Sequence, residues 1–236
     1  KDGRDITVES RIVLGTMNGR RLALESTRDV TERRQWEHRQ QVLLRELSHR
    51  VKNTLAVVQA IARQTLRHAP SDADFVARFD GRLAALGRAH NLLVASDWRG
   101  ANLAELARSQ LEAYATDSTD RLHIGGEPVF LPADLATPFA LVLHELATNA
   151  SKYGSLSRPA GSVHLAWTIA RQNGGRTLNL AWQEQGGPQI GSPTHTGLGT
   201  TLIDTAIPGA RVTREFRPEG LRCTIAAPLP EQAATE

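Results

Sequence analysis

Residues 144–154, with the sequence HELATNASKYG, decide the fold of the C-terminal half of the chain. Glu145, Asn149 and Lys152 are spaced i, i+4 and i+7, so on a helix they share one face. A carboxylate, an amide oxygen and an ammonium on one face can converge on Mg²⁺ and a triphosphate. The alternative is a solvated helix that packs only through its leucines.

Two glycine groups follow this stretch, WQEQGGP at residues 182–188 and GLGTTL at residues 197–202. Glycines at the start of a helix let backbone N–H groups approach phosphate, at the positive end of the helix dipole. Glu184, at the end of a predicted strand, could accept a hydrogen bond from an adenine amino group. Together with the Asn149 helix, these groups predict one nucleotide pocket. The polar run QIGSPTHT between them, residues 189–196, is typical of a mobile lid.

The residues around these motifs predict an α/β sandwich. The expected elements are helix 102–115, strand 122–126, helix 131–153, strands 163–171 and 176–184, helix 200–206, and strands 210–218 and 220–228. Short helices alternate with strands, which favours helices packed on one face of a mixed sheet.

Two long amphipathic helices are expected upstream of the sandwich. Residues 34–67 contain no helix breaker, and apolar residues recur at three- and four-residue spacing from Leu44 to Ala62. A second helix begins after Ser71, a candidate cap, and carries a similar stripe. The two helices form an antiparallel hairpin, and a dimeric four-helix bundle would bury both stripes. A monomer whose hairpin packs on the C-terminal domain is the alternative.

His49 points away from the apolar stripe of the first helix. At about 100° per residue it lies about 200° from Leu47 and about 160° from Val51, so we expect it to be exposed. Glu46 and Asn53 lie on the same face. An exposed imidazole among polar neighbours can act as a nucleophile. A solvated helix face that contains a histidine by chance is the alternative.

The N-terminal residues predict a β-hairpin. Two β-rich runs, 6–15 and 20–27, flank the turn signal Asn18-Gly19. The hairpin and the following DVTER at residues 29–33 resemble the end of a PAS sensor domain, whose last strand passes into a signalling helix. The first residues have the character of a strand interior, so we expect further sequence upstream.

Composition argues against several classes of function. The net charge of +3 is spread along the chain without basic tracts, so no nucleic-acid partner is expected. No apolar run reaches about 18 residues, so no membrane contact by this fragment is expected. The single cysteine, Cys223, can form no internal disulfide, which favours a reducing, cytoplasmic compartment.

The motifs resemble those of the HWE group of sensor histidine kinases over about 200 residues. The run LSHRVKNTLAVVQAIA, residues 47–62, resembles the phosphoacceptor helix of that group, and HELATNASKYG resembles its N box. WQEQGGP and GLGTTLI resemble its glycine boxes. The residues that name the group correspond to His144, Trp182 and Glu184. The resemblance implies a Bergerat-type α/β sandwich after a helical hairpin, an α+β fold overall.

The resemblance also implies roles for single residues. His49 would accept the phosphoryl group and Asn149 would hold Mg²⁺. Beside these, Glu145 is a candidate catalytic residue that could contact the metal through water. The residues expected to contact ATP are Asn149, Lys152, Tyr153, Glu184, Gly186, Gly187, Gly197 and Gly199. Arg50 stands where many histidine kinases place the carboxylate that accepts the imidazole proton, so Glu46 or a group of the ATP domain is the candidate base.

The sequence therefore predicts three domains: a PAS-like fragment at 1–30, a dimerisation and phosphotransfer hairpin at 31–98, and a catalytic ATP-binding domain at 99–236. The expected function is a homodimeric transmitter that phosphorylates His49 from Mg-ATP and passes the group to an aspartate of a response-regulator receiver domain. Two alternatives stay open: a Bergerat-fold ATPase in which Glu145 activates water, and a non-catalytic scaffold that binds receivers through the His49 face.

Overall fold

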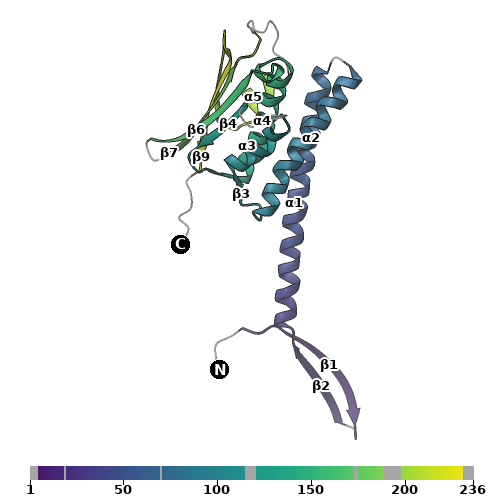
Figure 1. Ribbon diagram of the computed structural model, residues 1–236. Helices are drawn as coiled ribbons and strands as arrows, with labels where there is room; N and C mark the ends of the chain where they lie inside the picture. The colour runs from purple at the N-terminus through teal and green to yellow at the C-terminus, as the bar shows by residue number, and fades with distance from the viewer. Residues whose placement is uncertain are drawn as a thin grey trace. The chain divides into compact units, whose positions relative to one another are not determined.

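The computed structural model describes residues 5–18, 20–69, 71–114, 121–172, 175–188 and 198–230 (Figure 1). Its contacts divide the chain into two compact units, Lys1–Ala60 and Ile61–Glu236. Helix α1 (Thr31–His68) begins in the first unit and ends in the second. The domain boundaries near residues 30 and 98 stay predictions.

The first unit opens with the predicted β-hairpin. Strand β1 (Val8–Met17) pairs antiparallel with β2 (Arg20–Asp29), from Val8 opposite Asp29 to Met17 opposite Arg20. Asn18 has a φ of 53°, the positive angle that a tight hairpin turn requires, so the predicted turn is confirmed.

Helix α1 starts at Thr31, directly after Asp29, which caps it. The Asp29 carboxylate accepts hydrogen bonds from the Thr31 backbone N–H at 2.8 Å and from its hydroxyl at 2.6 Å. Within the first unit the apolar stripe of α1 is exposed, with Leu47 at 59% and Leu55 at 56% of full exposure. This unit therefore leaves an apolar helix face without cover of its own.

The second unit contains the predicted α/β sandwich. One mixed sheet has the order β4-β6-β7-β9-β8, in which only β4 and β6 are parallel. Its strands are β4 (Leu122–Gly126), β6 (Ser162–Gln172), β7 (Gly175–Gln185), β8 (Arg211–Arg217) and β9 (Gly220–Leu229). Helices α3 (Leu103–Leu111), α4 (Ala133–Lys152) and α5 (Leu198–Thr205) lie on one face of the sheet (Figure 1).

Alternating burial explains how the sheet meets these helices. In β7 every second side chain from Leu178 to Glu184 is buried, and the apolar ones pack into the core. The core is completed by α4, on which Phe139, Leu143 and Leu146 are fully buried. The α+β class and the one-sided layering predicted from the sequence are confirmed.

Helix α2 (Asp72–Ala95) belongs to the same unit as the sandwich. Ser71 caps it as predicted, since its hydroxyl oxygen accepts a hydrogen bond from the Asp74 N–H at 3.2 Å. The helix buries Leu86 and Leu93 and packs against α3 and α4. In this structure α2 therefore shares a core with the sandwich.

Several short elements were not predicted. Strand β3 (Gly100–Asn102) pairs antiparallel with β5 (Phe130–Pro132), which delays the start of α4 from Leu131 to Ala133. Helix α3 ends at Leu111 and passes into the 3-10 turn η1 (Glu112–Tyr114). Three-residue strands carry no usable periodicity, so the pattern could not reveal them. Among the helices described here, none combines the length and the apolar character that crossing a membrane requires.

Candidate functional site

The polar face of α4 borders a cavity of about 240 Å³ in the second unit. The residues predicted for the nucleotide site that line it are Glu145, Asn149, Lys152, Tyr153 and Gly199. Helix α2 adds Ala77, Arg78, Gly81 and Arg82 to the same lining. The structure thus brings the predicted carboxylate, amide and ammonium together, and adds two arginines that the sequence did not single out.

Exposure rises along this face of α4. Glu145 is 7% exposed, Asn149 is half-buried, and Tyr153 is 63% exposed. The leucines of α4 are buried on its other side, so the helix both packs through its leucines and presents a polar face. Of these three side chains, Glu145 is therefore the least accessible to water.

Gly199, near the start of α5, lies very close to α4. A Cβ atom built on Gly199 would lie 2.7 Å from Glu145 Oε2 and 3.3 Å from Asn149 Nδ2. Any larger residue would collide with the Glu145 carboxylate and crowd the Asn149 amide, so glycine lets the start of α5 approach the polar face. The second glycine group therefore meets the α4 motif, as the sequence predicted.

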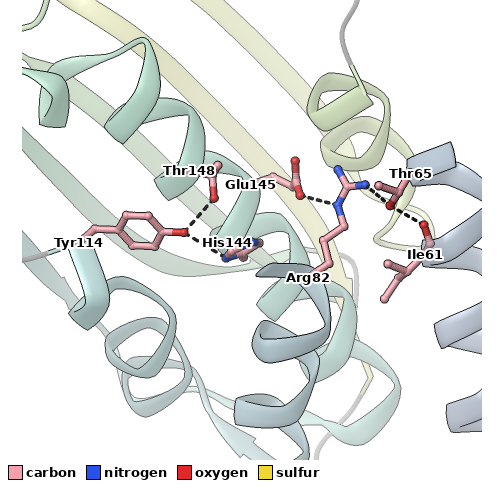
Figure 2. A network of polar contacts seen from close by, with 7 residues as sticks. All are labelled: Ile61, Thr65, Arg82, Tyr114, His144, Glu145 and Thr148. Atoms are coloured by element: carbon pink, nitrogen blue, oxygen red, sulfur yellow. Dashed lines mark hydrogen bonds and ion pairs between the residues drawn. The ribbon is translucent and has the colours of Figure 1, made fainter. Parts of the chain in front are cut away.

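Arg82 forms a buried polar network with Glu145 and Thr65 (Figure 2). Its Nε donates to Glu145 Oε1 at 2.8 Å, and the two side chains are 3% and 9% exposed. Its Nη1 donates to the Thr65 hydroxyl at 2.7 Å, and that hydroxyl donates to the Ile61 carbonyl at 2.6 Å. A buried charge is tolerated when it is paired and hydrogen-bonded, and this network provides both conditions.

His144 is held beside Glu145 by a second small network (Figure 2). The Tyr114 hydroxyl lies 3.3 Å from His144 Nδ1 and 2.8 Å from the Thr148 hydroxyl. Burial lowers the pKa of His144 below its ordinary value. A Cβ on Gly81 would lie 3.1 Å from His144 Nε2, so Gly81 permits the close approach of α2 to α4. His144 therefore packs at this helix contact, where burial favours its neutral form.

Glu184 does not line this cavity. It is 2% exposed near the end of β7, where one carboxylate oxygen accepts from the Ser155 N–H at 2.8 Å and the other from Trp182 Nε1 at 3.1 Å. Burial raises the pKa of Glu184, while these two hydrogen bonds act in the opposite direction. Trp182 is fully buried. Trp182 and Glu184, which the sequence motifs singled out, thus form one buried hydrogen-bonded pair.

Glycines pack tightly around Glu184. A Cβ on Gly154 would lie 2.0 Å from Glu184 Oε2, and a Cβ on Gly187 would lie 2.8 Å from the Ser155 Cα. Gly186 has a φ of 71°, a left-handed conformation that favours glycine. The first glycine group therefore lies against Gly154 and Ser155, which follow the last residues of α4.

His49 lies in the first unit and is exposed, as predicted. Its Nδ1 is 3.4 Å from the Asn53 side-chain amide. Glu46, the candidate base, forms an ion pair with Arg50 one turn along the helix. Gly197 and the expected lid at residues 189–196 lie outside the described residues.

The donor set near Gly199 suits Mg²⁺. Glu145 Oε2 and the Asn149 side chain approach the same point, and a Cβ there would lie 3.6 Å from Asn149 Oδ1. Mg²⁺ prefers oxygen ligands and commonly takes only one or two from protein, with water and phosphate oxygens completing its shell. In the part of the chain that the structure describes, no cluster of three or more His, Cys, Asp or Glu could hold a metal. The site therefore fits a metal that arrives with a phosphate ligand.

Sequence reasoning missed Arg82, Tyr114 and Ser155. Each contacts a predicted residue that is distant along the chain: Arg82 is 63 residues from Glu145, Tyr114 is 30 residues from His144, and Ser155 is 29 residues from Glu184. No motif or helical spacing joins these pairs, so only the folded chain reveals them.

Comparison with known proteins agrees with the sequence motifs. Residues 46–128 match the family model described as HWE histidine kinase. The chain is 36% identical over 204 residues to a blue-light-activated histidine kinase of Brucella anthropi, which covers 85% of this chain and 42% of that protein. A protein of the same description from Brucella ovis is 33% identical over 211 residues, covering 88% of this chain and 43% of the relative. The chain thus spans less than half the length of these relatives.

A solved structure shows the same fold. The blue-light activated histidine kinase of Erythrobacter litoralis EL346 is similar with a TM-score of 0.56 at 20% identity, over 80% of this chain and 60% of that chain. At this level of identity the likeness supports the arrangement of helices and sheet.

Proposed function

We propose that this chain, which belongs to the HWE histidine kinase family, is a transmitter that phosphorylates its own His49 from Mg-ATP. It then passes the phosphoryl group to an aspartate of a response-regulator receiver domain. The observation that carries the proposal is the cavity at α4, where Glu145, Asn149 and Lys152 meet Gly199. It combines oxygen donors for a metal with a cation and backbone N–H groups for phosphate.

Each residue at the cavity has a proposed task. Mg²⁺, when bound, neutralises charge on the triphosphate. Asn149 would hold the metal through its amide oxygen, and Glu145 would contact it through water. Lys152 and the N–H groups at the start of α5 bind phosphate oxygens, while the exposed Tyr153 covers the nucleotide. The buried Glu184, with Gly186 and Gly187, shapes the adenine end through the chain around Ser155.

His49 is the proposed acceptor because its imidazole is exposed on α1 and a ring nitrogen is accessible for attack. The N–P bond forms as the terminal P–O bond of ATP breaks, ADP leaves, and the imidazole proton passes to a base. Glu46 is one candidate base, although its ion pair with Arg50 must then open. A carboxylate of the ATP-binding domain is the other.

The exposed stripe of α1 supports a homodimer. Leu47 and Leu55 are more than half exposed, and apolar residues at this spacing are the usual seam of a helical bundle. A second copy of the hairpin would cover the stripe. We expect light scattering to give the mass of a dimer, and a Leu47→Glu variant to shift it towards the monomer.

The decisive experiment separates acceptance from nucleotide binding. His49→Gln removes the imidazole and leaves the second unit unchanged, so it should keep its affinity for ATP while taking up no label from γ-labelled ATP. Asn149→Ala should lose both, because it removes a metal ligand. The label on the wild-type protein should be labile in acid and stable in alkali, as a phosphoramidate is.

The same experiment tests the alternatives. ATP turnover without label on the protein would indicate the ATPase, and absence of nucleotide binding would indicate the scaffold. Label retained by His49→Gln would exclude His49 as the acceptor.

A further inference from the structure

The two carboxylate oxygens of Glu145 have different surroundings. Oε1 accepts a hydrogen bond from Arg82 Nε at 2.8 Å. Oε2 lies on the other side, towards Gly199 and Asn149, where a Cβ on Gly199 would be 2.7 Å away. Within the described ranges Oε2 accepts no hydrogen bond, so one oxygen is fixed by the protein and the other faces the cavity.

Arg82 is itself fixed by the fold. It is 2% exposed and Thr65 is fully buried, and the hydrogen bond between them is 2.7 Å long. The Thr65 hydroxyl is oriented in turn by the Ile61 carbonyl. Figure 2 shows this chain of contacts running from the end of α1 through α2 to α4. The guanidinium therefore has one orientation, set by residues that do not reach the cavity.

A planar guanidinium can control the rotamer of a carboxylate. Its donors point in fixed directions, so a contact to Oε1 and a contact to Thr65 together define where Oε2 lies. Free glutamate side chains sample many rotamers, and a metal site must hold its oxygens within a narrow range of geometry. Partners behind metal ligands commonly serve this purpose in metalloproteins.

We infer that Arg82 is a positioning residue for the metal-nucleotide site: by binding Oε1, it directs Oε2 of Glu145 towards Asn149 and the phosphate end of the cavity. The inference rests on the proposed function, since it assumes that Mg-nucleotide binds at α4. It assigns a role to a residue of helix α2, outside the motifs of the ATP-binding region.

The test measures how much Mg²⁺ strengthens nucleotide binding. A non-hydrolysable ATP analogue is titrated calorimetrically with Mg²⁺ and with EDTA, and the ratio of the two dissociation constants is the magnesium gain. Arg82→Gln should reduce the gain about tenfold, the lower end of the usual effect of losing a partner behind a residue of a metal site. In a Glu145→Gln background the same substitution should have no further effect on the gain.

The matched control is Arg88→Gln. Arg88 lies on the same helix and its guanidinium binds the Gln110 side-chain oxygen at 3.0 Å, outside the cavity lining. This variant makes the same change of charge and should keep the wild-type magnesium gain. A general effect of charge or of α2 stability would lower binding in both variants, with and without Mg²⁺.

A second variant guards against failure to fold. Removing one partner of a buried pair can destabilise a protein severely. Arg82→Lys keeps the charge but cannot contact Glu145 and Thr65 with the same planar geometry, so its gain should still fall about tenfold.

The outcomes distinguish this inference from the proposed function. A wild-type protein that binds no nucleotide overturns both. A wild-type protein whose binding is strengthened by Mg²⁺, with the same gain in the Arg82 variants, overturns only the inference. Equal weakening with and without Mg²⁺ also overturns it, because Arg82 would then act only on stability.

Discussion

Replacing Trp182 with phenylalanine should destabilise the second unit, and this loss of stability should grow as pH rises. Trp182 is fully buried and its Nε1 donates to the buried Glu184 carboxylate at 3.1 Å. Losing a hydrogen bond to a charged group costs about 1.5–3 kcal/mol, and the lost ring atoms add about 1 kcal/mol. We therefore expect the free energy of unfolding to fall by about 3 kcal/mol at pH values where Glu184 is ionised in both proteins.

The matched control is Trp167→Phe. Trp167 is 3% exposed and its Nε1 donates at 2.7 Å to the neutral carbonyl of Glu127. A neutral hydrogen bond contributes about 1 kcal/mol, so with a similar loss of packing this variant should be less destabilised, by about 2 kcal/mol. The two variants make the same chemical change and differ mainly in the charge of the acceptor.

The pH dependence gives the sharper test. The Trp182 hydrogen bond lowers the pKa of Glu184, so without it the Glu184 pKa in the folded variant is higher than in the folded wild type. At pH values between these two pKa values, the folded variant binds more protons than the folded wild type. The stability difference should therefore be small in acid and grow as pH rises through this window, which lies above the ordinary value of 4.5.

Urea unfolding followed by circular dichroism, from about pH 5 to about pH 8, measures this difference directly. The Trp167→Phe difference should stay constant over the same range. A Trp182→Phe difference that is constant, or that shrinks as pH rises, would refute the idea that the indole stabilises the ionised carboxylate.

Two further predictions concern buried positions of the same unit. Gly154→Ala should lower the free energy of unfolding by more than about 2 kcal/mol, because its Cβ would lie 2.0 Å from Glu184 Oε2. The control Gly125→Ala, whose Cβ would have no atom within 4 Å, should change the free energy of unfolding by less than about 1 kcal/mol. Equal effects of the two substitutions in urea titrations would contradict this packing. Cys223, fully buried and with its pKa raised to about 12 by burial, should resist a thiol reagent in the native protein and react fully in urea. Fast native labelling at neutral pH would show that this strand is open.

Much of the fold could be predicted because its signals are local. The hairpin turn at Asn18, the cap at Ser71 and the alternation along β7 each depend on residues within a few positions of one another. The start of α4 was misplaced for the opposite reason. Leu131 pairs in a short strand with Ala101, which lies in a different segment of the chain.

The candidate site shows the same division. Helical spacing placed Glu145, Asn149 and Lys152 on one face, and the structure gathers them at one cavity. Spacing could not reveal that Glu184 is buried behind the end of α4, because that depends on Ser155 and Trp182 meeting it. Nor could it reveal Arg82, since an arginine in an amphipathic helix is far more often a surface residue.

Helix α4 therefore joins two chemically distinct places. Through Glu145 it is tied to α2 and, by Thr65, to the end of α1, while the chain after its last turn is tied through Ser155 to the Glu184 carboxylate on β7. Both ties use buried carboxylates with hydrogen-bonded partners, which resist displacement because either partner alone would be left buried and unsatisfied. A shift of α2 or of the end of α1 must then either move α4 or break the Arg82 pair. For this reason we expect the end of α1 and the Glu145 side of the cavity to move together. A substitution at Thr65 should then change the position of Asn149, which lies on the same helix as Glu145.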